Sequence, residues 1–129
     1  MNGWVVLGVA VGSGVGAQLR FATERLHARA RERRGLGRPS FPWATLTVNI
    51  VGSMVLGAAA ALAARGVVSS PWLTVLGVGL AGGLTTFSTF ALDVVELARE
   101  RRVTRALLDI ALHLTLGLGA GAAMFHVLH

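Results

Sequence analysis

The chain has 129 residues, of which 53% are hydrophobic and 14% are charged, and its formal net charge is +6. This composition is more apolar than a water-soluble domain of that length needs, so it predicts an integral membrane protein. Cysteine is absent, which excludes disulfides and thiolate metal sites.

Four segments are long and apolar enough to cross a hydrocarbon core, which takes about 20 residues of helix. They cover about residues 4–21, 43–64, 72–98 and 106–128. The predicted fold class is therefore all-α integral membrane, with four transmembrane helices in a single domain over residues 1–129. We do not expect the first segment to be a cleaved signal peptide, because no basic region precedes it and three further spans follow.

The positive charge is unevenly distributed along the chain. Eleven of the twelve arginines lie in or beside the first and third loops, and only Arg65 lies in the second loop. By the positive-inside rule, this bias predicts a multi-pass protein of the cell inner (plasma) membrane with both termini outside and the arginine-rich loops in the cytoplasm. Nucleic-acid binding is not expected, because no aromatic platform accompanies the arginines.

The first span and first loop combine small and basic residues. Gly8, Gly12, Gly14 and Gly16 predict a face for close helix packing. Arg20 ends the span, where its side chain can reach interfacial water or the mouth of a pore. Residues 22–40 are expected to form an amphipathic helix on the membrane surface, followed by a turn at residues 35–39.

The second span carries polar residues, among which Asn49 has the strongest requirement for partners. Its amide offers two N–H donors and one acceptor, so it can bind an anion without adding net charge. A hydrogen bond between helices is the alternative role.

The third span contains a segment that is unfavourable for a helix, Gly-Gly-Leu-Thr-Thr-Phe-Ser-Thr-Phe at residues 82–90. Irregular backbone at membrane depth is tolerated only against protein or a water-filled cavity. We therefore predict two half-helices meeting near residues 82–86, where carbonyls can bind a cation and a helix N-terminus can favour an anion. Phe87 and Phe90 share one face, either beside this site or as ordinary core.

The fourth span contains Asp109 and His113, one helical turn apart. Because Arg105 precedes Asp109 by four residues, we expect an interfacial salt bridge between these two side chains. Asp109 and His113 alone are too few ligands for a zinc site.

Three of these motifs resemble those of the Fluc (CrcB) fluoride-channel family: residues 16–21, residues 42–53 and, most specifically, residues 79–90. The resemblance implies a passive, fluoride-selective channel that exports cytoplasmic fluoride and gives fluoride resistance. It also implies an antiparallel dimer of four-helix subunits with narrow pores lined by both.

The resemblance assigns individual residues. Side chains along the fluoride path would be the ring edges of Phe87 and Phe90, the amide of Asn49, the polar groups of Thr45 and Ser88, and the vestibule arginine Arg20. The backbone carbonyls of Gly82 and Thr85 match those that hold a structural sodium ion at the dimer axis. Asp93 stands where the family usually has Glu.

Two features depart from the family pattern. Asp109 replaces a Tyr and His113 replaces a small hydroxyl residue, and a carboxylate facing an anion path repels fluoride unless it is protonated or paired. We therefore expect one of the two pores to be degenerate. The arginine bias also opposes insertion in both orientations, which predicts a heterodimer with a homologous subunit of opposite orientation.

Two other functions stay open from the sequence. One is a weakly conducting structural subunit of such a heterodimer. The other is a small multidrug-type exporter, which needs a membrane-embedded Glu in its first helix, whereas the first span here has no acidic residue. An enzyme is not expected, because no nucleophile stands at a recognisable spacing from a base.

Overall fold

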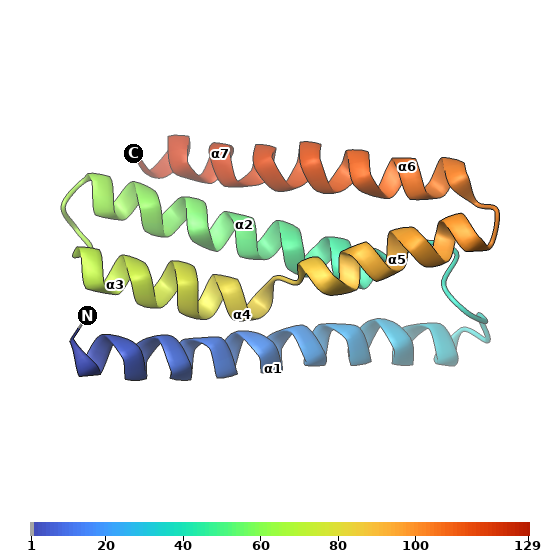
Figure 1. The fold of residues 1–129 in the computed structure, drawn as a ribbon, viewed down its shortest axis with the longest axis horizontal. Helices are drawn as coiled ribbons and strands as arrows, with labels where there is room; N and C mark the ends of the chain where they lie inside the picture. The colour runs from blue at the N-terminus through green and yellow to red at the C-terminus, as the bar shows by residue number, and fades with distance from the viewer. Residues whose placement is uncertain (1) are drawn as a thin grey trace.

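A computed structural model describes residues 2–129 and places the four predicted spans in helices that run alternately up and down (Figure 1). The first two are α1 (Gly3–Arg33) and α2 (Trp43–Ala64), and the fourth runs from α6 (Val103–Leu112) through the π-helical η2 (His113–Gly117) to α7 (Leu118–Leu128). Each of the four is long and apolar enough to cross a membrane. The predicted fold class of four transmembrane helices is confirmed.

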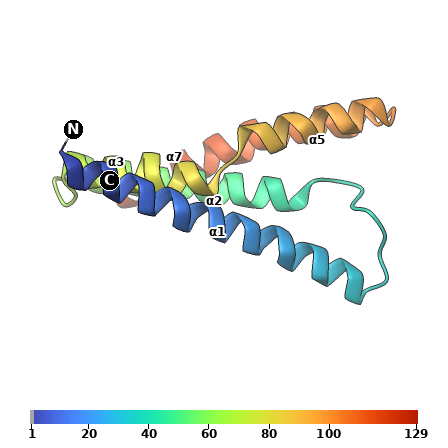
Figure 2. The same ribbon diagram turned by 60° about the horizontal axis from the view of Figure 1, so that its bottom comes forward.

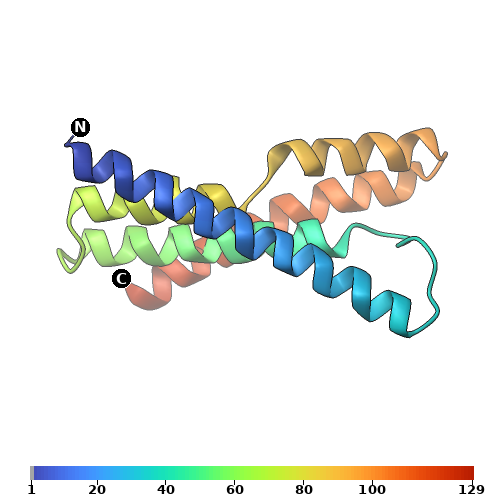
Figure 3. The same ribbon diagram turned by 90° about the horizontal axis from the view of Figure 1, so that it is seen from below.

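The third span is broken, as predicted. It consists of α3 (Ser70–Thr74), the π-helical η1 (Val75–Ala81) and α4 (Gly82–Leu84), followed by two extended residues and then α5 (Phe87–Arg99). Thr85 has φ −77° and ψ 160°, and Thr86 has φ −148° and ψ 118°. The change of direction between α4 and α5 is plain in Figure 3.

The first helix continues without interruption from Gly3 to Arg33. The prediction of a separate amphipathic helix over residues 22–40 is therefore wrong. Residues 22–33 continue the first span along its own axis. Alanines and arginines are good helix formers, and nothing between residues 20 and 33 breaks the helix. The predicted turn begins at Gly35, whose φ of +64° is favourable for glycine.

Close backbone contacts hold the half of the bundle that contains the termini. A methyl group added at Gly16 of α1 would come within 2.6 Å of the Leu84 nitrogen, so only glycine lets α1 approach α4. Gly8 and Gly12 also face the third helix. Gly14 contacts no other helix of this chain.

Both termini lie at one end of the molecule, together with the turn between α2 and α3 (Figure 1). At the opposite end, the molecule divides into two arms (Figure 2). One arm is the pair of α5 and α6, and the other is the end of α1. The arginine-rich segments lie at this second end, because they form the last turns of α1, the loop after it and the connection from α5 to α6.

Most of the apolar surface faces outward. Only 11 to 28% of the most apolar window of each span is buried within the chain. Such extensive exposed apolar surface suits contact with lipid or with another subunit.

Candidate functional site

The break in the third helix lies beside Asn49 of α2. The Thr86 N–H donates to Asn49 Oδ1 at 2.8 Å, and Asn49 Nδ2 donates to the Thr86 carbonyl oxygen at 3.2 Å. In a membrane, backbone groups freed by a helix break need such partners. Asn49 therefore has a structural role at the break, and the second N–H of its amide has no acceptor among the described residues.

Thr86 also begins the second half-helix. Its Oγ1 accepts a hydrogen bond from the Thr89 N–H at 3.2 Å and lies 3.3 Å from the hydroxyl of Ser88. This is the N-cap role that threonine favours. This role of Thr86 was missed from the sequence, although a threonine directly before a helical segment signals an N-cap. Ser88, a predicted pore residue, is exposed beside it.

Backbone carbonyls at the break fit a cation in part. In a continuous helix the Thr86 N–H would donate to the Gly82 carbonyl, but it donates to Asn49 instead, which frees the Gly82 oxygen. The Thr85 carbonyl accepts from Arg20 Nη1 at 3.0 Å and keeps a second lone pair. One chain thus supplies two oxygens, so a sodium ion here would need further ligands.

The two phenylalanines of α5 lie side by side, with ring centroids 5.8 Å apart and planes inclined by 54°. The Phe87 side chain is 80% exposed on the surface of this chain, whereas Phe90 is half-buried. The Phe90 ring contacts the His113 ring of the fourth helix at a centroid distance of 4.4 Å. Phe87 is thus not core within this chain, and its ring is free to line a path or an interface.

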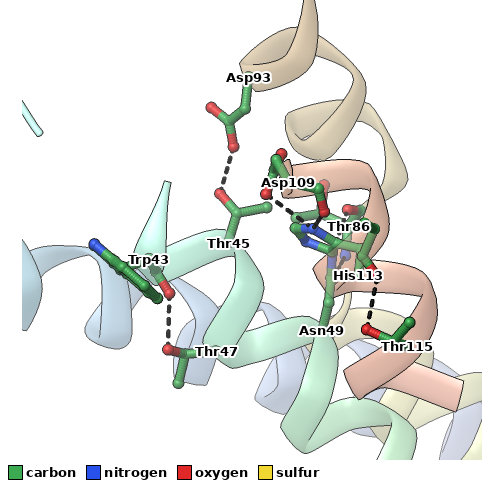
Figure 4. Close-up of polar contacts among 10 residues, drawn as sticks. Trp43, Thr45, Thr47, Asn49, Thr86, Asp93, Asp109, His113 and Thr115 are labelled. Atoms are coloured by element: carbon green, nitrogen blue, oxygen red, sulfur yellow. Dashed lines mark hydrogen bonds and ion pairs between the residues drawn. The ribbon is translucent and has the colours of Figure 1, made fainter. Parts of the chain in front are cut away.

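Thr45 lies one turn from Asn49 on α2 and donates its hydroxyl to Asp93 Oδ2 of α5 at 2.7 Å (Figure 4). Both side chains line a cavity of about 780 Å³ between the two arms, which opens at the arginine-rich end. Thr45 thus lies in the wall of this cavity, with its hydroxyl already bonded to Asp93.

Asp109 and His113 form a buried pair on the fourth helix. Asp109 is fully buried, and His113 Nδ1 lies 3.0 Å from its carboxylate Oδ1 and 3.0 Å from its backbone carbonyl oxygen. The predicted salt bridge from Arg105 to Asp109 is wrong. Asp109 faces inward toward α2 and α5 (Figure 4), whereas Arg105 is exposed and donates to the Ser40 carbonyl at 3.1 Å.

The predicted site residues therefore converge from α1, α2 and the third helix, with His113 as an additional neighbour of Phe90. Residues 7–125 match the family model described as CrcB-like protein, Camphor Resistance (CrcB). The chain belongs to the CrcB family. The recognition made from the three motifs is confirmed.

Relatives of this CrcB protein are named fluoride-specific ion channel FluC. The protein of Aeromonas salmonicida is 46% identical over 117 residues, which cover 90% of this chain and 87% of the relative. The protein of Renibacterium salmoninarum is 39% identical over 90% of this chain and 92% of its own length. The protein of Vibrio vulnificus is 36% identical over 99% of this chain and 98% of its own. CrcB proteins are channels, so the prediction that this chain is not an enzyme is confirmed.

Proposed function

We propose that this chain is a subunit of a passive, fluoride-selective channel that exports cytoplasmic fluoride through a dimeric, double-barrelled pore. The observation that carries the proposal is the break at Thr85–Thr86, which Asn49 stabilises next to Phe87 and Phe90. Family membership and the names of the relatives support fluoride as the ion.

The donors at the break suit fluoride. The ion is small and strongly hydrated, so a channel has to replace its water without holding it too tightly. Asn49 contributes a free amide N–H, and Ser88 contributes an exposed hydroxyl. Phe87 contributes the positive edge of an exposed ring. None of these groups is charged, so fluoride is bound weakly at each and passes from one to the next.

A structural sodium ion forms part of the proposal. The carbonyl oxygens of Gly82 and Thr85 would hold it, together with ligands from a second subunit. When bound, it supplies positive potential near the anion path. Within this chain, Asn49 holds the break open at Thr86 and Arg20 donates to the Thr85 carbonyl.

The partner is proposed to be a homologous subunit of opposite orientation, in an antiparallel heterodimer. Eleven of the twelve arginines lie in or beside the loops at the end of the molecule away from both termini, which favours one orientation in the inner membrane, with the termini outside. The exposed ring of Phe87 and the large outward apolar surface leave room for such a partner.

One alternative is a weakly conducting structural subunit, which the buried carboxylate of Asp109 favours. A small multidrug-type exporter is disfavoured by family membership and by the lack of an acidic residue in the membrane part of α1.

Fluoride efflux from liposomes tests the proposal. The chain is reconstituted alone and after co-expression with a homologous subunit of inverted arginine bias, and a fluoride electrode records the initial rate. We expect fast efflux with the partner and one orientation of a terminal tag when the chain is expressed alone. Efflux no faster than from protein-free liposomes in both preparations would refute the channel, and equal orientations would refute the heterodimer.

A further inference from the structure

The buried pair on the fourth helix has polar atoms without hydrogen-bond partners. Among the described residues, nothing bonds to His113 Nε2 or to either carboxylate oxygen of Asp109, although Oδ1 lies at ion-pair distance from Nδ1. The His113 side chain is only 9% exposed. A buried polar atom without a partner is costly, so the missing partner is expected to be a water or an ion.

The contacts of His113 fix where its protons lie. Nδ1 faces the Asp109 carbonyl oxygen and the Asp109 carboxylate, and a carbonyl oxygen can only accept, so Nδ1 carries a hydrogen. An unpaired carboxylate is costly to bury, and a second proton on the imidazole makes the pair neutral overall. In that state Nε2 is also a donor, and it has no acceptor.

The surroundings of His113 contain few other charges. On α5, Asp93 interacts electrostatically with both members of the pair and accepts the Thr45 hydroxyl, with Glu96 close to Asp93. α2 packs against η2 and has no charged residue along its length; Thr45 and Asn49 lie on this side (Figure 4). The Phe90 ring covers the imidazole at 4.4 Å.

We propose that His113, held by Asp109, is an additional fluoride-binding residue that donates its Nε2–H to the ion beside Phe90. This inference rests on the proposed function. It gives Asp109 a role other than repulsion, because the carboxylate balances the imidazolium and the pair adds a donor without net positive charge. Because the Nε2 hydrogen is the donor, a ring that lacks it cannot bind the ion at this nitrogen.

Binding is tested by side-chain ¹⁵N NMR on protein with labelled histidine, co-purified with the partner subunit. The His113 signals are identified by their loss in His113→Gln, and His126 on α7 serves as the internal reference. We expect both ring nitrogens of His113 to carry hydrogen, and sodium fluoride, but not sodium chloride, to shift the Nε2 signal. An Nε2 signal that ignores fluoride would overturn the inference.

Conduction is tested in the same preparation by fluoride efflux at pH 6, corrected for leakage of neutral HF from protein-free liposomes. His113→Gln replaces the charged donor by a neutral one and leaves Asp109 unbalanced, so efflux should fall about fivefold, from the difference between charged and neutral hydrogen bonds. The control His126→Gln should pass fluoride as the wild type does. Equal efflux of His113→Gln and the wild type would refute the His113 inference alone. Absence of fluoride efflux in every preparation would refute the proposed function as well.

Discussion

The break in the third helix and the Asp109–His113 pair on the fourth both place polar groups inside the spanning region, but they differ in how far this chain supplies hydrogen-bond partners. Asn49 pairs with the N–H and carbonyl of Thr86, and Thr86 caps α5. At the pair, three buried side-chain atoms have no hydrogen-bond partner in the described part of the chain. The region that follows the family motif thus binds most of its own polar groups and leaves the Gly82 carbonyl free, whereas the region that departs from the motif needs a further group.

This difference also bears on the expected degenerate pore. That expectation assumed a carboxylate facing the anion path, and Asp109 is instead fully buried and paired with His113. A carboxylate that is paired repels fluoride less, and the contact with His113 pairs the Asp109 carboxylate. The fourth helix is therefore the place where experiments can separate an impaired pore from one with a different donor.

The largest effect is expected at Asn49. Asn49→Ala removes both partners of the Thr86 backbone and should destabilise the fold by about 2 to 6 kcal/mol, at about 1 to 3 kcal/mol for each unsatisfied group. Thermal unfolding in detergent measures this loss. Thr47→Ala is the matched control, because the exposed Thr47 hydroxyl donates only to the Trp43 carbonyl of its own helix. Similar losses in the two variants would contradict the role given to Asn49.

Asp109→Ala should follow, with a loss of about 3 kcal/mol, because it leaves the His113 ring buried without its partner. Arg105→Ala should change stability by less than about 1 kcal/mol, since Arg105 is exposed and does not contact Asp109. A double-mutant cycle with His113→Ala measures the coupling directly. Additive losses would show that the two side chains do not stabilise each other.

Replacing the pair by the family residues, as Asp109→Tyr with His113→Ser, tests what the pair does to conduction. If the pair impairs the pore, efflux should rise. If His113 is a fluoride donor, efflux should stay within about twofold of the wild type, because one donor replaces another. Fluoride efflux at pH 6 distinguishes these results.

The smallest effect is expected at the cap of α5. Thr86→Ala removes the oxygen that accepts from the Thr89 N–H and should cost about 1 kcal/mol, whereas Thr86→Ser keeps it. Thermal unfolding of both variants checks this. A serine variant as unstable as the alanine variant would argue that the Thr86 methyl group, and not the cap, stabilises this region.

Local patterns were enough to predict the four helices and the position of the break. Apolar length defined the spans, and Gly82, Gly83 and the threonines after them marked the interruption. Side-chain partners were harder to predict. Arg105 and His113 both stand four residues from Asp109, but the fourth helix turns Asp109 inward, where it pairs with His113, and leaves Arg105 exposed. The pairing of Asn49 with Thr86 likewise depends on how α2 lies against the break.

The most direct test of the central claim compares fluoride efflux of the wild-type heterodimer with that of Asn49→Asp. Aspartate keeps the acceptor for the Thr86 N–H but loses the amide donors and adds negative charge. We expect a folded protein whose efflux falls to the level of protein-free liposomes, while wild type passes fluoride and excludes chloride. Efflux of Asn49→Asp equal to that of the wild type would show that fluoride does not pass the break at Asn49.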